Sequence, residues 1–239
     1  QMEKELRSSP VLVRDPALNA YVREVACKVT REHCRDLRVY IINAPVFNAS
    51  MAPNGAMLVF TGALLRMQDE SELALVLGHE FAHFRQRHTL QYWVKAKRTS
   101  AWMASFSMVG LVGSVLQLAG LASMFDFTRD MEREADAIGF ATAASLGYDS
   151  QAGVRLWTRM LAEEKANRQS KTWPIFASHP RTAERLEDVG LAARAAPAGD
   201  VRTERETYRK AMQPFLSAWL EAELSRRMYD TSIQVIGTL

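Results

Sequence analysis

The residues His79-Glu80-Phe81-Ala82-His83 carry the side chains that a metal-dependent hydrolase needs. Histidines at positions i and i+4 lie on one face of an α-helix, so both imidazoles can bind one metal ion. The Glu80 carboxylate can hold a metal-bound water and deprotonate it. The motif therefore predicts one Zn²⁺ ion per chain, with His79 and His83 as ligands and Glu80 as the catalytic base. Zinc is inferred from the ligand types, which also accept other divalent ions.

A catalytic zinc usually takes three protein ligands and one water, and an acidic segment further along the chain can supply the third ligand. One face of the helix expected there carries mostly small or short residues: Glu132, Ala135, Asp136 and Gly139. Such a face lets this helix approach the histidine-bearing helix closely. Glu132 would then be the third ligand, and Asp136 would accept a hydrogen bond from a ligand imidazole. Glu134 points to a different side of the helix and is the weaker candidate.

Two other histidines are expected to lie outside the site. His88 comes nine residues after His79, which is about half a turn around one continuous helix, so it should face away from the metal. His33 lies among charged residues and is typical of a surface histidine.

Together with a third motif, Ser178-His179-Pro180, these patterns resemble metallopeptidase family forty-eight, which includes the HtpX and CAAX prenyl proteases. The resemblance covers roughly residues 15–185. It implies Glu132 as the third zinc ligand, in agreement with the helical-face argument. It is strongest to the soluble periplasmic members, which implies a protein of the periplasm or associated with the outer membrane of a bacterial cell envelope.

His179 precedes Pro180, a favourable first residue of a helix, so we expect it at a helix N-terminus. The helix dipole there favours the neutral imidazole. Three roles are then open: a catalytic donor that stabilises the oxyanion, a fourth zinc ligand that displaces the catalytic water in a latent state, or a cap of its own helix. The resemblance favours the second role, because the matching histidine of a periplasmic member can cap the zinc.

Helices are expected to form most of the chain. Asp69 and Glu72 form a capping-box start for the histidine-bearing helix, which we expect to run to about Lys95. An earlier helix should begin at Asp15 and end near Thr30. Later helices are expected over residues 130–146, 150–166, 180–195 and 201–227.

A small sheet is expected between the first two helices. Residues 37–42 are β-branched and aromatic, and residues 48–60 contain a Pro-Asn-Gly turn between two further strands. The fold class predicted is α+β, predominantly helical, with a zincin-like catalytic domain. We expect the edge of this sheet to accept an extended substrate as an additional strand.

Two domains are expected. Residues 1–195 form the zinc metallopeptidase catalytic domain, and residues 196–239 form a helical C-terminal extension. The last segment, 228–239, begins an amphipathic pattern and stops without a cap. We therefore interpret the extension as the start of a tetratricopeptide-like helical-repeat region.

Residues 101–125 contain no charged side chain and are long enough to cross a membrane as one helix. The expected zinc ligands lie on both sides of this segment, so a single crossing would separate residues that must meet at one ion. Two short helices packed on the core fit better. A hairpin that contacts the membrane surface is the alternative.

Cys27 and Cys34 lie seven positions apart. On one continuous helix they would be about 10 Å apart along the axis, so a disulfide requires the helix to end between them. The sequence leaves both the bonded and the free state open.

The composition is that of a globular protein. The 239 residues are 48% hydrophobic and 24% charged, which argues against a disordered, collagen-like or disulfide-scaffold chain. Thirty Lys and Arg against 27 Asp and Glu give a formal net charge of +3. That excess is too small to favour a nucleic-acid partner.

These observations predict a zinc-dependent endopeptidase in envelope protein quality control, with misfolded or unassembled envelope proteins as its polypeptide substrates. The alternative is a latent protease that acts as a chaperone or assembly factor for outer-membrane proteins. In that hypothesis His179 caps the zinc, and the protein contacts the outer-membrane assembly machinery. A membrane-embedded protease is disfavoured, because no segment besides 101–125 could span a bilayer.

Overall fold

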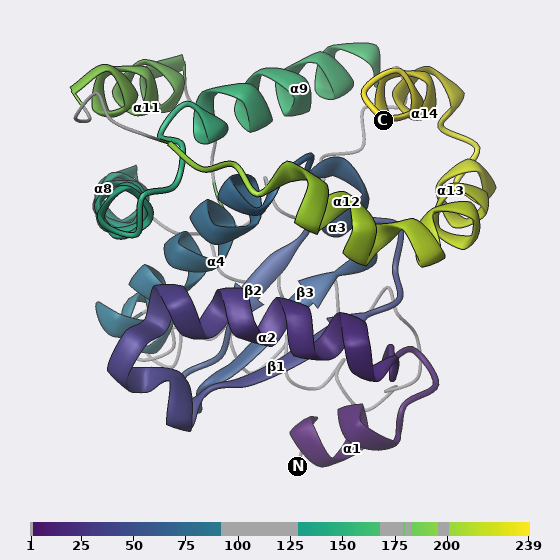
Figure 1. Cartoon of the computed structure of the whole chain (residues 1–239), viewed down its shortest axis with the longest axis horizontal. Helices are drawn as coiled ribbons and strands as arrows, with labels where there is room; N and C mark the ends of the chain where they lie inside the picture. Colours follow the sequence, from purple (N-terminus) through teal and green to yellow (C-terminus); the bar gives the residue numbers. More distant parts are fainter. Residues whose placement is uncertain (1, 92–128, 168–178, 180–182, 196–200) are drawn as a thin grey trace, which may run out of the picture.

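The computed structural model describes residues 2–91, 129–167, 179, 183–195 and 201–239. Helices dominate this part of the chain and accompany a single small sheet (Figure 1). The α+β, predominantly helical fold class is thereby confirmed. The helices are α1 (Met2–Ser8), α2 (Pro16–Thr30), α3 (Thr61–Arg66), α4 (Glu70–Arg85), α8 (Arg129–Ser145), α9 (Ala152–Ala166), α11 (Ala183–Ala195), α12 (Arg205–Met212), α13 (Leu216–Ser225) and α14 (Tyr229–Ile236), with 3₁₀ segments η1 (Arg31–Asp36) and η3 (Gln213–Phe215).

The sheet contains three strands, as the sequence predicts: β1 (Arg38–Ile42), β2 (Ala49–Met51) and β3 (Ala56–Phe60). Their order is β1-β3-β2, with β3 parallel to β1 and antiparallel to β2. Gly55 closes the turn between β2 and β3 with a φ of 85°, a left-handed conformation that favours glycine. In the described sheet, β2 is therefore an outer strand.

The two faces of the sheet are buried in different clusters, because side chains alternate along each strand. Ile41 and Val59 belong to the main core, which α2 and α4 share. Ile42 and Phe60 point to the opposite face and pack with Leu6 of α1. In Figure 1, α2 lies across the sheet, and α4 runs between the sheet and α8. The sheet thus supports α4 from one side.

Helix α4 begins as the sequence predicts. Asp69 is the N-cap, and its carboxylate accepts a hydrogen bond from the Glu72 amide at 3.0 Å. The Glu72 carboxylate accepts in turn from the amide of Gln68 at 2.9 Å. These reciprocal bonds satisfy two amides at the helix start, which fixes where the helix begins.

The prediction that this helix runs to about Lys95 is wrong, because α4 ends at Arg85. The chain turns at Arg87, which has a left-handed φ of 59° and donates its amide hydrogen to the Phe84 carbonyl at 3.0 Å. Residues 88–91 are helical again. Neither glycine nor proline marks this turn, so the sequence carried no recognisable stop signal.

The single helix expected over 201–227 is also wrong, because η3 separates α12 from α13. Pro214 lies in η3; it has no amide hydrogen, and its ring disfavours a continuous α-helix. These helices pack against the preceding part of the chain, where the buried Tyr208 donates its hydroxyl hydrogen to the Leu64 carbonyl at 2.6 Å. A separate extension over residues 196–239 stays a prediction.

Cys27 and Cys34 form a disulfide, and their Cα atoms are 4.7 Å apart. Helix α2 ends at Thr30, and η1 continues the chain in a tighter turn. The helix thus ends between the two cysteines, which is the condition that a bond requires.

Among the described residues, no helix is both long enough and apolar enough to cross a membrane. The uncharged segment 101–125 lies outside those residues. Its interpretation as a packed or membrane-contacting hairpin stays a prediction.

Candidate metal centre

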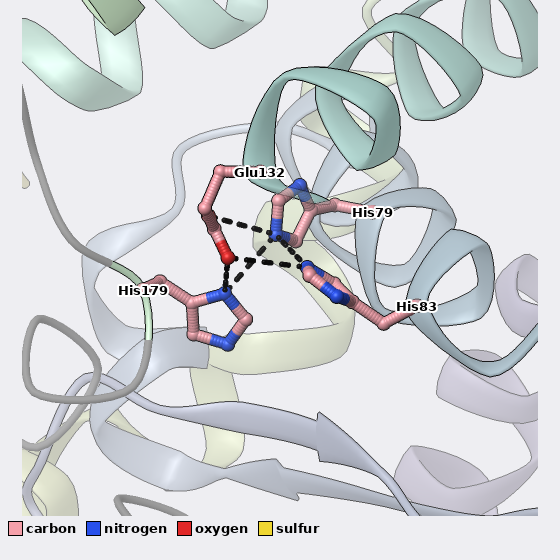
Figure 2. Close-up of side chains that lie close together, drawn as sticks. All are labelled: His79, His83, Glu132 and His179. Atoms are coloured by element: carbon pink, nitrogen blue, oxygen red, sulfur yellow. Dashed lines mark hydrogen bonds and ion pairs between the residues drawn. The ribbon is translucent and has the colours of Figure 1, made fainter. Parts of the chain in front are cut away.

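Four side chains that could bind a metal ion point toward one another: His79, His83, Glu132 and His179 (Figure 2). The first two come from α4 and Glu132 comes from α8, while His179 approaches from a separate segment. One ligand atom of each residue lies within 4.8 Å of those of the others. The structure therefore brings together all the residues that the sequence suggested as ligands.

The distances between these atoms fit a single ion. Nε2 of His79 lies 3.1 Å from Nε2 of His83 and 3.2 Å from Nδ1 of His179. Oε1 of Glu132 lies 3.3 Å from Nε2 of His83 and 2.9 Å from Nδ1 of His179. Ligand atoms about 2.0–2.1 Å from a tetrahedral zinc are about 3.3 Å from one another. The residues present thus fit a tetrahedral zinc ion.

Gly139 permits this geometry, because α4 and α8 approach each other closely where they cross. A Cβ atom on Gly139 would lie 3.0 Å from the backbone nitrogen of His79, and one on Gly78 would lie 3.5 Å from Cα of Gly139. The face of α8 that carries Glu132 and Asp136 is buried, as the pattern of small residues predicts. Close contact between the helices brings Glu132 to the histidines.

The charge balance of the cluster favours a bound cation. Burial alone would raise the pKa of Glu132, but His179 and His83 beside it lower that pKa well below its ordinary range. Burial also lowers the pKa of His83. The carboxylate is therefore ionised and the His83 ring is neutral near neutral pH, which are the forms that bind metal.

Asp136 orients one of the histidines. Its Oδ1 lies 2.9 Å from Nδ1 of His79, while Nε2 of the same ring faces the cluster. A neutral His79 that donates its Nδ1 hydrogen to Asp136 leaves the Nε2 lone pair for a metal ion. The contact expected from the helical face is thus present.

The model of Peptidase family M48 matches residues 12–192, which include every residue of this cluster. The chain belongs to peptidase family M48. The family resemblance seen in the sequence motifs is thereby confirmed.

Several relatives share more than the motifs. The putative beta-barrel assembly-enhancing protease of Vibrio cholerae is 30% identical over 208 residues, which cover 80% of this chain and 42% of that protein. The beta-barrel assembly-enhancing protease of Escherichia coli K12 is 31% identical over 207 residues, which cover 78% of this chain and 41% of that protein. The mitochondrial metalloendopeptidase OMA1 of Schizosaccharomyces pombe is 32% identical over 159 residues, covering 63% and 45%. This chain spans less than half the length of these relatives.

The two predicted catalytic residues of this M48 chain lie side by side. Oε1 of Glu80 is 3.6 Å from Nε2 of His179, and both side chains are buried. The ring of His179 presents its other nitrogen to Glu132 and His79. It thus links the metal cluster to Glu80. The helix start expected at Pro180 lies outside the described residues.

The predicted position of His88 is wrong. We expected it on the surface, facing away from the metal, but it is only 2% exposed, and its Nδ1 lies 3.1 Å from Nδ1 of His83. The half-turn estimate assumed one continuous helix, whereas α4 ends at Arg85 before His88 is reached. The missing stop signal at Arg87 explains why the contact was not predicted.

The remaining candidates lie where the sequence placed them. The side chain of His33 is 44% exposed, and its ring packs beside Phe81. The side chain of Glu134 is 47% exposed and lies outside the cluster of four ligand candidates.

An apolar cavity adjoins the cluster. His79, Glu80, Asp136 and His179 form its polar wall. The rest of its lining is mostly aliphatic and aromatic: Phe47, Leu75, Val76, Phe140, Leu156, Trp157 and Met160. An extended polypeptide could place an apolar side chain there while its backbone lies beside Glu80.

Proposed function

We propose that this chain is the catalytic part of a zinc-dependent endopeptidase. The observation that carries the proposal is the convergence of His79, His83, Glu132 and His179 within 4.8 Å, next to the buried carboxylate of Glu80. Imidazole nitrogens with one carboxylate are a typical ligand set for catalytic zinc. Membership of family M48 and the names of the relatives, which are proteases and metalloendopeptidases, support the same activity.

Each residue has a separate role in the proposed reaction. His79, His83 and Glu132 hold the ion, and Asp136 keeps the His79 ring oriented. Bound zinc would polarise the scissile carbonyl and acidify the attacking water. Glu80 removes the proton from that water and later donates it to the leaving amine.

The sheet offers a binding mode for the substrate. β2 is an outer strand of the described sheet, and it packs against α4, the helix that carries Glu80. An extended polypeptide could pair with an outer strand through backbone hydrogen bonds. This arrangement supports cleavage of unfolded or unassembled chains, whose backbone is available.

The cell envelope is the proposed location. The Cys27–Cys34 disulfide supports an oxidising compartment such as the bacterial periplasm. Two of the relatives are named for enhancing β-barrel assembly, and both are bacterial proteins. Misfolded or unassembled outer-membrane proteins are therefore the proposed substrates, with contact to the outer membrane or its assembly machinery.

A latent protease that acts as a chaperone or assembly factor is the second candidate function. The observation that favours it is the position of His179, whose Nδ1 lies 2.9 Å from Glu132 and 3.2 Å from His79. As a fourth ligand, His179 would occupy the position that the attacking water needs. In the oxyanion role, this ring would instead donate a hydrogen bond to the substrate oxygen.

Glu80→Gln tests the two functions together. We expect the variant to keep its zinc and to cleave casein about 10²–10⁴-fold more slowly than wild type, because the base is lost while the ligands stay. Assembly of an outer-membrane β-barrel client should be measured in parallel. Rescue of the client by Glu80→Gln would favour the chaperone, and casein cleavage at the wild-type rate would exclude Glu80 as the base.

His179→Ala distinguishes the roles of His179. If this residue caps the zinc, casein cleavage should increase, because water gains the fourth position. If it stabilises the oxyanion, turnover should fall about 10²–10³-fold with zinc still bound. Activity equal to wild type would contradict both roles.

A further inference from the structure

We propose that His88 is a positioning residue of the metal centre, which fixes the orientation and the tautomer of His83 and connects it to the carboxylate of Glu134. The proposal rests on the zinc site of the proposed function and adds residues to it.

The three side chains form a chain from the cluster to the surface. Nε2 of His83 faces the other ligands, while its Nδ1 lies 3.1 Å from Nδ1 of His88. Nε2 of His88 lies 3.2 Å from Oε2 of Glu134. His88 is buried, and Glu134 is half exposed at the outer end. The side-chain amide of Gln86 also donates a hydrogen bond to the Glu134 carboxylate, which holds that carboxylate in place.

The hydrogen-bond directions follow from the metal site. A neutral His83 that offers its Nε2 lone pair to zinc must carry its hydrogen on Nδ1. That hydrogen can be shared with His88 only if Nδ1 of His88 is an acceptor. The hydrogen of a neutral His88 must then be on Nε2, where the Glu134 carboxylate accepts it. The chain therefore runs in one direction, from His83 through His88 to Glu134.

The turn after α4 makes this contact available. On a continuous helix, residue 88 would lie about half a turn from residue 79. The helix instead ends at Arg85, and Arg87 adopts a left-handed φ of 59°, which non-glycine residues rarely adopt. The residue after this turn is His88, whose ring reaches back to His83.

Both ligand histidines of α4 thus have an oriented Nδ1 atom. His79 contacts the Asp136 carboxylate directly, whereas His83 reaches a carboxylate through one intervening imidazole. Residues that orient metal ligands in this way typically change metal affinity about 10–100-fold when replaced. We expect an effect of that size at His88.

The test compares His88→Phe with His88→Asn in the full 239-residue chain. Phe keeps an aromatic ring in the buried site but removes the acceptor, whereas the Asn amide oxygen can replace Nδ1 as acceptor. His33→Phe, at a histidine outside the cluster, is the matched control. Zinc affinity should be measured by competition with a chromophoric chelator, the ligand geometry by the visible spectrum of the Co²⁺ form, and kcat and KM with a peptide substrate.

We expect His88→Phe to bind zinc about 10–100-fold more weakly, to change the Co²⁺ spectrum, and to lower kcat more than it raises KM. His88→Asn should recover most of the affinity, and His33→Phe should match wild type. Equal loss in the Phe and Asn variants would mean that a hydrogen-bond acceptor at residue 88 does not restore zinc binding, which would overturn the proposal. Wild-type zinc affinity in His88→Phe would overturn it as well.

A second measurement needs no substitution and covers the case in which His88→Phe does not fold. Nitrogen NMR of the zinc-bound, histidine-labelled wild-type chain reports which ring nitrogen carries hydrogen. We expect hydrogen on Nδ1 of His83 and on Nε2 of His88; hydrogen on Nδ1 of His88 would overturn the proposal. If the wild-type chain bound no zinc, the proposed function would fail, whereas failure at His88 alone would leave that function intact.

Discussion

Helix α4 has buried carboxylates near each of its ends, and the two groups are neutralised in different ways. Near its start, Asp69, Glu70 and Glu72 are buried and face Lys and Arg side chains. The ion pairs are Lys28–Glu70 at 3.1 Å, Arg155–Asp69 at 3.0 Å and Arg159–Glu72. Near its other end, the buried Glu132 of α8 contacts imidazoles of the metal cluster. The carboxylates of the first group are paired with Lys and Arg side chains, whereas Glu132 and its imidazoles are arranged to bind a metal ion.

The pKa shifts of these carboxylates have different causes. Burial would raise the pKa of Glu70, but hydrogen bonds from Tyr148, Tyr21 and Lys28 lower it below its ordinary value. Burial keeps the pKa of Glu72 raised even with Arg159 beside it. Contacts with His179 and His83 lower the pKa of Glu132, while burial lowers the pKa of His83, so the His83 ring keeps a lone pair for a metal.

A buried acidic cluster therefore does not by itself indicate a metal site. Buried charges need partners, and the partner type decides between a structural and a metal-binding role. A carboxylate paired with a guanidinium or ammonium group is already neutralised. A carboxylate beside imidazoles can instead bind a metal ion together with them.

Replacement of Glu132 by Gln should give the largest change in zinc affinity, because it removes the negative charge from the metal cluster. We expect affinity for Zn²⁺ to fall more than about 100-fold, since even residues that only orient ligands contribute about 10–100-fold. The metal-free protein should also lose some stability near neutral pH, because the contacts that lower the pKa of Glu132 favour its ionised form in the folded chain. Chelator competition and urea unfolding without metal measure the two quantities. Unchanged zinc affinity would remove Glu132 from the ligand set.

Replacement of Glu72 by Gln should lower stability without changing zinc affinity. It weakens the contact with Arg159 and the bond from the Gln68 amide, so we expect the free energy of unfolding to fall by about 2 kcal/mol. Zinc affinity should stay at the wild-type value, because the change lies at the other end of α4. If Glu72→Gln lost zinc as strongly as Glu132→Gln, the two groups would not be independent.

The sequence predicted the metal cluster better than the ion pairs near the start of α4. His79, His83, Glu132 and Asp136 follow local helix periodicity, and Gly139 lies on the same small-residue face. Such patterns depend on spacing within one helix, so they can be recognised without knowing the tertiary structure.

The features that were missed depend on contacts between distant segments or on a turn without a sequence signal. Arg155 and Arg159 reach the start of α4 from 86 and 87 residues away, and charged residues on a helix look like a solvated face in sequence. His88 was missed because Arg87 ends α4 in a conformation that non-glycine residues rarely adopt. The break at Pro214 did have a signal, the proline itself.

The smallest expected effect is a change in the pH dependence of stability, and it concerns only the carboxylates near the start of α4. The folded-state pKa of Glu70 is below its ordinary value of 4.5, so its contribution to stability is complete above about pH 4.5 and is lost as the pH falls through the folded-state pKa. Urea unfolding from pH 6 downward should therefore show a steeper loss of stability in wild type than in Glu70→Gln. Glu24→Gln is the matched control, because Glu24 pairs with the same Lys28 but is 67% exposed. Wild type and Glu70→Gln with equal slopes would show that the hydrogen bonds from Tyr148, Tyr21 and Lys28 do not hold this carboxylate ionised.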